Sequence, residues 1–203
     1  MDARFARCAL AVAAAAAAAG CFDEPTPASR IVPEGARVYL QDKGLKDLSA
    51  HADALRPELV DYVNLDRNEL EALPPELAGL AGLKWLRLNG NRLSSLPDLS
   101  ALKSLRRIYL RGNRFEKVPE SLKDLPSLTD VDLSQNPVSE VPDWFVKMTT
   151  LENVSLSETR ITKLPDDLGG WRNLTSLQLG GLRMSAEEMA RVRAALPKVA
   201  IVF

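Results

Sequence analysis

The sequence predicts an α/β solenoid, a coil of stacked turns with a parallel sheet on its concave side and short helical turns on its convex side. Three observations predict this fold. Six segments begin 22 or 23 residues apart, each has apolar residues at its first, fourth and sixth positions, and four have asparagine at the ninth. Self-similarity at a fixed period of about 20–50 residues indicates a repeat architecture, in which neighbouring turns bury a shared core.

Each repeat is expected to contain one short strand. Its apolar fourth and sixth positions flank a more polar fifth, which is the alternation of a strand with one buried face. The equivalent strand of the next repeat would lie about 4.8 Å away, so the strands would stack into a curved parallel sheet. The first, fourth and sixth positions are Val60/Val63/Leu65, Leu83/Leu86/Leu88, Leu105/Ile108/Leu110, Leu128/Val131/Leu133, Leu151/Val154/Leu156 and Leu174/Leu177/Leu179.

A proline follows an apolar-x-x-apolar step in each of the first five repeats. Proline lacks the N–H that a strand needs, but it suits the start of a helical turn, where an N–H is spare. An acidic residue within the next two positions also favours a helix N-terminus. The prolines are Pro74, Pro97, Pro119, Pro142 and Pro165, and the acids are Glu76, Asp98, Glu120, Asp143 and Asp166.

These repeats resemble the leucine-rich repeat family, in its 23-residue class with a Leu-Pro step after the asparagine, and the resemblance covers residues 60–182. It implies a right-handed superhelix in which each buried asparagine bonds backbone groups of its own and adjacent turns, forming a ladder. Loss of one rung, as in Asn113→Ala, is expected to cost about 1–3 kcal/mol. The ladder residues are Asn68, Asn91, Asn113 and Asn136, and the ladder is expected to fade at Thr159 and Leu182.

Residues 183–203 are predicted to form a C-terminal cap, because an open solenoid end exposes apolar side chains. Ser185 and Glu188 have the spacing of a capping box, which marks a helix start. Met189, Val192 and Leu196 follow at helical spacing and should cover the last repeat. Residues 199–203 are expected to add a final strand to the sheet.

Residues 33–59 are predicted to form an N-terminal cap, a degenerate first repeat. Val38 and Leu40 precede Val63 and Leu65 by 25 residues, and Lys43 takes the position of the ladder asparagine. His51 would lie in the convex segment of this repeat. A catalytic or metal-binding role for His51 is the alternative, but no second histidine, cysteine or fixed acidic partner supports it.

Residues 1–20 are predicted to be a secretory signal peptide. Two arginines precede an uncharged apolar run over 8–19, which is too short to span a bilayer. The junction Ala18-Ala19-Gly20-Cys21 resembles a bacterial lipobox, which implies that Cys21 becomes the lipid-bearing first residue of the mature protein. The alternative is ordinary cleavage near Ala19, which would leave Cys21 as a free thiol.

Residues 21–32 are expected to be the lipidated cysteine and a tether, because proline and polar residues there favour an extended chain. The lipid would be the chain's contact with the membrane. Phe22 follows Cys21 where aspartate would favour inner-membrane retention, so the protein is expected in the bacterial cell envelope as an outer-membrane lipoprotein.

The composition argues against nucleic-acid binding and most enzymes. The 203 residues include 26 bases and 27 acids, a net charge of -1, so the basic surplus that phosphates require is missing. One histidine and two cysteines are too few for a Cys/His zinc site. Gly169-Gly170 and Gly180-Gly181 lack the pattern of a phosphate-binding loop. We therefore expect no catalytic residue, no metal site and no cofactor.

Repeat positions two, three, five, seven and eight should face the concave surface, as the resemblance implies. Bases and aromatics gather there in the second and third repeats, and acids follow in the fourth and fifth, while position seven of the first repeat is Asp66. Arginine and aromatic residues are typical of binding hot spots. The alternative is a solvated sheet whose charges pair across strands. The candidate partner-binding residues are Tyr62, Lys84, Trp85, Arg87, Arg106, Arg107, Tyr109, Arg111, Asp130 and Asp132.

The expected function is therefore a non-catalytic, membrane-tethered and monomeric recognition module that binds a partner protein through its concave face. A binder of glycans or cell wall is one alternative, since aromatic side chains beside arginine and aspartate can stack on sugars and hydrogen-bond to them. A structural envelope lipoprotein is another.

Overall fold

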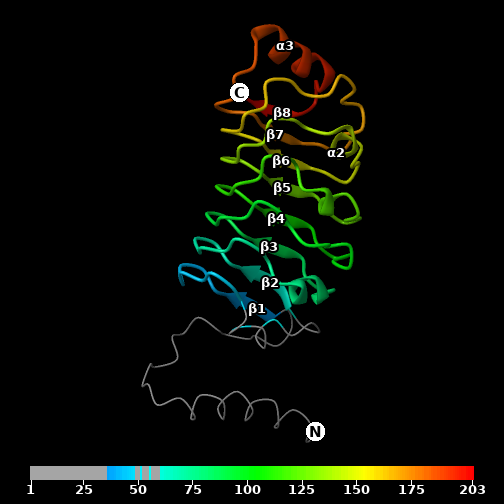
Figure 1. Cartoon of the computed structure of the whole chain (residues 1–203). Helices are drawn as coiled ribbons and strands as arrows, with labels where there is room; N and C mark the ends of the chain where they lie inside the picture. The colour runs from blue at the N-terminus through cyan, green and yellow to red at the C-terminus, as the bar shows by residue number, and fades with distance from the viewer. Residues whose placement is uncertain (1–35, 49–50, 52–54, 56–59) are drawn as a thin grey trace, which may run out of the picture.

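Eight parallel strands stack in chain order into one open sheet in the part of the chain that the computed structural model describes, residues 36–48, 51, 55 and 60–203. The predicted leader, Cys21 and the tether lie outside this part, as do residues 33–35, 49–50, 52–54 and 56–59 of the predicted N-terminal cap. Figure 1 shows the strands one above another, with loops on both sides of them and the short helices of the repeats on one side. The strands are β1 Ala36–Tyr39, β2 Val60–Asn64, β3 Trp85–Arg87, β4 Arg107–Tyr109, β5 Asp130–Asp132, β6 Asn153–Ser155, β7 Ser176–Gln178 and β8 Ala200–Val202.

The solenoid prediction is confirmed, with a shift of one residue in the strands. Strands β3 to β7 occupy repeat positions three to five, whereas the sequence predicted four to six. The backbone pairing nevertheless continues through position six, because the N–H of Leu88 donates to the carbonyl of Tyr109 at 2.8 Å. The apolar alternation marks the buried side chains, and the regular strand geometry begins one residue before them.

The core lies between the sheet and the convex segments. The side chains at repeat positions one, four and six, such as Leu83, Leu86 and Leu88, are completely buried and belong to one continuous apolar cluster. Burial of this kind contributes about 25 cal/mol for each Å² of apolar surface removed from water. Because no cysteine lies among the described residues, packing without disulfides holds this part of the chain together.

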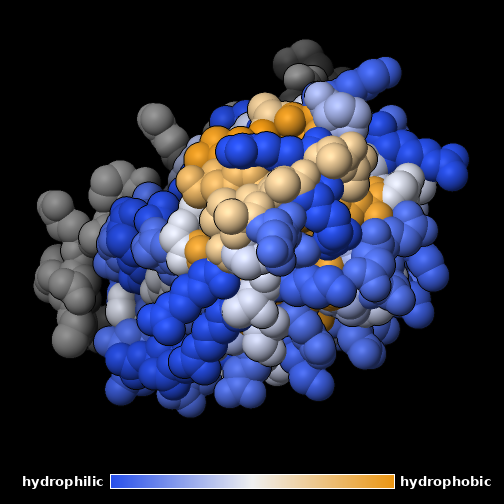
Figure 2. Space-filling view, turned by 90° about the horizontal axis from the view of Figure 1, so that it is seen from above, coloured by the Kyte–Doolittle hydropathy of each residue, from blue (hydrophilic) through white to orange (hydrophobic). Residues whose placement is uncertain are grey.

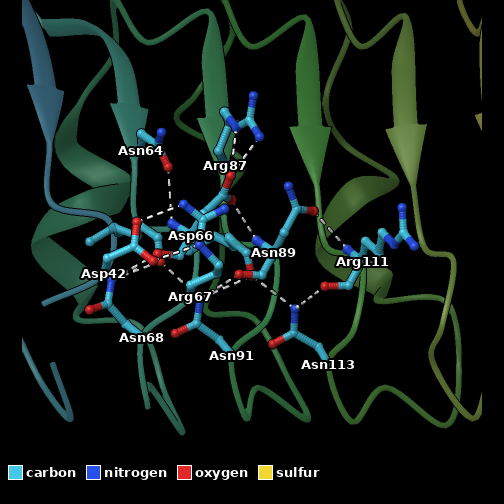
Figure 3. Close-up of polar contacts among 12 residues, drawn as sticks. Asp42, Asn64, Asp66, Arg67, Asn68, Arg87, Asn89, Asn91, Arg111 and Asn113 are labelled. Carbon is cyan, nitrogen blue, oxygen red and sulfur yellow. Dashed lines mark hydrogen bonds and ion pairs between the residues drawn. The ribbon is translucent and has the colours of Figure 1, made fainter. Parts of the chain in front are cut away.

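Four buried asparagines connect neighbouring turns through their side chains, and Figure 3 shows three of them, Asn68, Asn91 and Asn113. The Nδ2 of Asn113 donates to the carbonyls of Leu88 and Leu110, both at 2.9 Å, and its Oδ1 accepts from the N–H of Leu93 at 3.1 Å. The carbonyl of Leu110 also accepts from Asn136, the next asparagine of the series. Each shared carbonyl therefore ties one rung of the ladder to the next.

The ladder changes at both of its ends. At the N-terminal end, Oδ1 of Asn68 accepts from the N–H groups of Lys43 and Leu45, so Lys43 does occupy the asparagine position of a first repeat. At the C-terminal end, Thr159 donates only to the carbonyl of Leu156 in its own turn, at 2.8 Å. Leu182 has no polar side chain to contribute, and the cap begins there.

Helical turns follow three of the five prolines on the convex side. They are η3 Pro75–Gly79, η4 Glu120–Leu122 and α2 Asp143–Val146, and each follows a proline and has an acid in its first turn. The prediction is wrong at Pro97 and Pro165, where the chain forms no helix. The repeat that contains Pro97 has only 22 residues, and Asp98 and Asp167 instead accept from N–H groups two residues later, at 2.8 Å, which favours turns.

The predicted C-terminal cap is present as α3, Ala186–Ala195, followed by β8. Val192 and Leu196 are buried against the last repeat, and Met189 is partly buried against it. Figure 2 looks onto this end of the molecule and shows an apolar area surrounded by hydrophilic residues. The cap therefore covers the repeat core and presents a partly apolar surface of its own.

Half of the predicted capping box forms. Oγ of Ser185 accepts from the N–H of Glu188 at 3.1 Å, as a capping residue should. The Glu188 carboxylate does not reach back to Ser185. It accepts instead from the N–H of Leu164, 24 residues earlier at 2.9 Å, and from Arg191, whose Nη2 lies 2.7 Å away. Glu188 thus attaches the cap helix to the preceding repeat.

This attachment is expected to weaken in acid. The hydrogen bond from Arg191 lowers the pKa of Glu188. Burial raises this pKa by a smaller amount, and the hydrogen bond from the Leu164 N–H lowers it further. A carboxyl group whose pKa is lower in the folded than in the unfolded protein stabilises the fold above the pKa of the unfolded state, about 4.3. This stabilisation is lost as the pH falls through the pKa of the folded state. Glu188→Gln should therefore cost about 1–3 kcal/mol near neutral pH, and the difference should shrink below about pH 4. Urea unfolding from about pH 7 to pH 3 measures it.

The exposed neighbour Glu187 supplies the control, since Glu187→Gln removes a charge from the same helix turn without touching Leu164. A pH-independent difference between wild type and Glu188→Gln would show that the charge of Glu188 does not hold the cap.

Candidate concave binding surface

Two rows of side chains line the face of the sheet opposite the core, because alternate residues of a strand point to the same side. The pairing register places the residues of each row directly beside one another on successive strands. The first row is Arg37, Tyr62, Trp85, Arg107, Asp130, Asn153, Ser176 and Ala200, and the second is Tyr39, Asn64, Arg87, Tyr109, Asp132, Ser155, Gln178 and Val202.

Rings and guanidinium groups contact one another continuously across the first four strands. The ring centroids of Tyr39 and Tyr62 are 5.3 Å apart, and those of Tyr62 and Trp85 are 5.8 Å apart. The guanidinium carbon of Arg107 lies 4.6 Å from the Trp85 centroid, within the range of a cation–π contact. We call this set the aromatic–arginine cluster, which comprises Arg37, Tyr39, Tyr62, Trp85, Arg87, Arg107 and Tyr109.

Trp85 is the residue of the cluster with the clearest signature of a contact site. It is 39% exposed, and the only other large hydrophobic side chain so exposed among the described residues is Val202. Tyr62 borders its ring on one side and Arg107 on the other, so the ring is held in place before any partner arrives. An indole that is already immobilised loses little conformational entropy on binding.

Carboxylates hold both central arginines of the cluster. Nε of Arg107 lies 3.6 Å from Asp130 on the adjacent strand. Nε of Arg87 donates to Asp66 at 2.8 Å, and the guanidinium carbon of Arg87 lies 5.6 Å from the Tyr109 ring centroid. Burial acts to lower the pKa of Arg87, but the hydrogen bond and charge of Asp66 outweigh it and raise the pKa. Both guanidinium groups are therefore held in a fixed orientation.

Asp66 does not face the concave surface as a free position, contrary to the sequence expectation. It is only 2% exposed, and its second carboxylate oxygen accepts from the N–H of Asn89 at 2.8 Å (Figure 3). Its own N–H donates to Asn64. A carboxylate at position seven can bond the backbone of the next turn, so Asp66 is a positioning residue for Arg87 and not a contact residue.

Arg37 and Tyr39 belong to the surface although the sequence analysis did not include them. The guanidinium carbon of Arg37 lies 5.9 Å from the Tyr62 ring centroid, and Tyr39 extends the row of rings by one strand. The 25-residue offset that aligned Val38 with Val63 also assigns Arg37 and Tyr39 to positions three and five, so the signal was present in the sequence.

Three predicted residues lie beside the cluster rather than in it. Lys84 and Arg106 are exposed neighbours at repeat position two, and Nζ of Lys84 is 3.9 Å from Asp61. Arg111 is exposed at position seven, where its Nε donates to Gln135 at 2.9 Å. All three of these side chains are exposed, whereas Arg87 and Arg107 are half-buried and held by carboxylates.

A small hollow of about 150 Å³ lies on the same face toward the C-terminal end. A larger one of about 1110 Å³ lies on the convex side, between the turns around Pro97, Pro119 and Trp144. We place the candidate site on the concave face, because the exposed aromatic ring and the oriented charges are there. The small hollow is lined by Tyr109, Asp130, Val131, Asp132, Asn153, Val154, Ser155, Ser176 and Gln178.

Within the described part of the chain, no group of three or more His, Cys, Asp or Glu side chains is placed to hold a metal ion. No described helix is long and apolar enough to cross a membrane. His51 is half-buried, and its backbone N–H donates a hydrogen bond to the carbonyl of Leu48.

Comparison with known proteins agrees with this geometry. The family model described as Leucine rich repeat matches residues 58–115, and the structure is similar to that of the leucine-rich repeat protein LIC12759 of Leptospira interrogans. The two share 25% sequence identity with a TM-score of 0.62. The chain is a leucine-rich repeat protein.

The similarity covers 75% of this leucine-rich repeat protein and 45% of the Leptospira chain, so the chain corresponds to less than half of that relative's length. No curated protein matches it. The leucine-rich repeat fold is typical of protein-interaction modules and not of enzymes.

Proposed function

We propose that this leucine-rich repeat protein is a non-catalytic, membrane-tethered recognition module that binds a partner protein through its concave face. The observation that carries the proposal is the exposed ring of Trp85 held between Tyr62 and Arg107. Tryptophan, tyrosine and arginine dominate binding energies at protein interfaces. A rigid parallel sheet holds them, so a partner meets a prearranged surface.

The competing explanation is that the charged pairs of this face only stabilise the sheet. The pair of Arg107 and Asp130 is partly exposed and long, at 3.6 Å, so it contributes at most about 1 kcal/mol. Such a pair does not account for an exposed indole beside it. A contact site for a partner accounts for both.

The double substitution Trp85→Ala/Arg107→Glu should abolish capture of the partner from membrane extract by the full chain. It removes the exposed ring and reverses the charge beside it, and loss of such anchors typically costs about 2–4 kcal/mol of binding free energy. Affinity pull-down followed by mass spectrometry measures the capture. Thermal unfolding by circular dichroism checks that the fold survives, because neither side chain is buried.

Arg114→Glu is the matched control, since Arg114 is exposed outside the concave rows and the charge change is the same. If the double variant retained every partner that wild type and Arg114→Glu retain, the concave face would not be the binding surface.

We also propose that Cys21 carries the lipid that tethers the protein in the cell envelope. The charged start, the apolar run and the small residues before Cys21 support this assignment. Several acyl chains on one residue anchor more firmly than a single chain, whose membrane binding is marginal. A fatty-acid analogue should label the wild type and not Cys21→Ser, and equal labelling of both would refute the anchor.

A glycan or cell-wall ligand is the second candidate. The adjoining rings of Tyr39, Tyr62 and Trp85 favour it, because a row of aromatic faces can stack on sugar rings. Titration with cell-wall fragments should then change tryptophan fluorescence in wild type and leave it unchanged in Trp85→Phe, which retains Trp144 and Trp171.

A further inference from the structure

Basic side chains are concentrated in the second and third repeats. Residues 83–127 contain ten bases and four acids, whereas residues 60–82 contain one base and five acids, and residues 128–150 contain one base and four acids. The whole chain has a net charge of only -1, so a basic belt, residues 83–127, lies between two acidic repeats. A partner must match this alternation, because like charges brought together across an interface oppose binding.

Acids of the flanking repeats pair with part of the basic belt. Four bases lie within 4 Å of a carboxylate from a neighbouring repeat, in the pairs Lys84–Asp61, Arg87–Asp66, Arg92–Glu69 and Arg107–Asp130. The first pair is loose, at 3.9 Å, and 57% of the Lys84 side chain is exposed. Lys103 and Arg106 are exposed and form no ion pair with any residue that the structure describes. A partner can therefore reach Lys103 and Arg106 without displacing a bound carboxylate.

These exposed bases lie where the chain enters strands β3 and β4, next to the aromatic–arginine cluster. Lys84 directly precedes Trp85, and Arg106 directly precedes Arg107. The N–H of Arg106 donates to the carbonyl of Lys84 at 2.9 Å, so these two residues are neighbours on successive turns. Lys103 lies three residues before Arg106, in the turn that leads into β4. We call Lys84, Lys103 and Arg106 the basic edge.

Acidic side chains on both sides of the basic edge select against an extended anionic surface. Repeat position two is Asp61 in the repeat before Lys84 and Glu152 two repeats after Arg106. Membranes with anionic lipids and nucleic-acid duplexes carry negative charge over much more than the basic edge, whose two strands are about 4.8 Å apart. Such a surface would also meet these acids, which would oppose its binding. A short acidic segment can contact the basic edge alone.

We infer that the partner contributes a short acidic segment, which binds the basic edge while a neighbouring apolar side chain packs on Trp85. The carboxylates of the segment lie against Lys103 and Arg106, the two bases without an acidic partner. Exposed ion pairs contribute little affinity each, so these charges mainly speed association and select the partner, and the ring supplies the anchor. This inference rests on the proposed function and specifies the chemistry of the partner at that site.

Acidic peptides with one aromatic residue test the charge requirement directly. The probe is fluorescein-labelled EEFEE, its uncharged comparison is QQFQQ, and EEGEE lacks the ring. Fluorescence anisotropy with the full chain gives the dissociation constants at low and high concentrations of sodium chloride. We expect EEFEE to bind at least about fivefold more tightly than QQFQQ at low salt, and the difference to shrink at high salt. EEFEE should also bind more tightly than EEGEE, and this preference should be lost in Trp85→Ala.

Charge reversal at the basic edge gives the matched test in the protein. Lys103→Glu/Arg106→Glu should weaken binding of EEFEE about tenfold and leave binding of QQFQQ unchanged. Lys117→Glu/Lys123→Glu is the control, since it reverses two exposed bases of the same repeat on the convex side. This control should change the affinity for EEFEE by less than about twofold.

Equal affinities for EEFEE and QQFQQ, or equal effects of the two double variants, would overturn the inference. So would binding of the Cys21→Ser protein to phosphatidylglycerol vesicles that Lys103→Glu/Arg106→Glu abolishes, because the basic edge would then bind a lipid surface. If Trp85→Ala/Arg107→Glu still abolished partner capture in these cases, the proposed function would stand without this partner chemistry. The peptide measurements do not depend on capture of the partner, so the two failures are distinguishable.

Discussion

Asn113→Ala is expected to lower the free energy of unfolding by about 3 kcal/mol, the upper end of the range for one lost rung. The substitution leaves the N–H of Leu93 without its side-chain acceptor and removes one of the two asparagine donors from each of the carbonyls of Leu88 and Leu110. All three residues are completely buried, so water cannot easily replace the lost partners, and the N–H of Leu93 retains a desolvation penalty. Urea unfolding monitored by circular dichroism measures the change.

Thr159→Ala provides the comparison, because Thr159 occupies the ladder position of a later repeat. Thr159 is half-buried and makes one bond, to the carbonyl of Leu156, so its loss should cost about 1 kcal/mol or less. Equal costs for Asn113→Ala and Thr159→Ala would contradict the view that bonds between turns carry the stability of the ladder.

Gly170→Ala is expected to destabilise the protein by about 3 kcal/mol or more, the upper range for an overpacked site. A Cβ at this position would overlap the carbonyl oxygen of Val146 and would lie 2.9 Å from the Cα of Lys147. Both atoms belong to the backbone at the end of α2, so no flexible side chain can move away. The turn at Gly170 would have to separate from the preceding repeat, next to the buried ring of Trp171.

Gly79→Ala is the matched control for this effect. No atom lies within 4 Å of a Cβ built at Gly79, and its φ is not in the left-handed region. The substitution should change stability by no more than about 0.5 kcal/mol. Guanidinium or urea midpoints of the two variants give the comparison, and a Gly170→Ala protein as stable as Gly79→Ala would refute the close packing of these two turns.

Much of the candidate surface could be assigned from sequence because the repeat is regular. Once the apolar positions were aligned, Trp85, Arg107 and Asp130 fell at the same position of successive repeats, and the register of β3, β4 and β5 places them side by side. Tyr39 was missed only because the alignment was not extended to polar positions of the first repeat. Asp66 could not be assigned correctly, because position seven is exposed at Arg111 but buried at Asp66 and Ser134.

The repeat pattern alone predicted the solenoid, the order of its strands, the asparagine ladder and both caps, because side-chain burial in this fold recurs with a short, regular period along the chain. Only the folded structure shows the contacts between turns. Glu188 accepts a hydrogen bond from Leu164, Asp66 accepts one from Arg87, and Gly170 packs against the backbone of Val146. Each joins residues about one repeat apart, 21 to 24 positions along the chain. Whether such groups meet depends on the backbone path of two neighbouring turns. That path is set by the packing between the two turns, so the sequence of one repeat does not determine it.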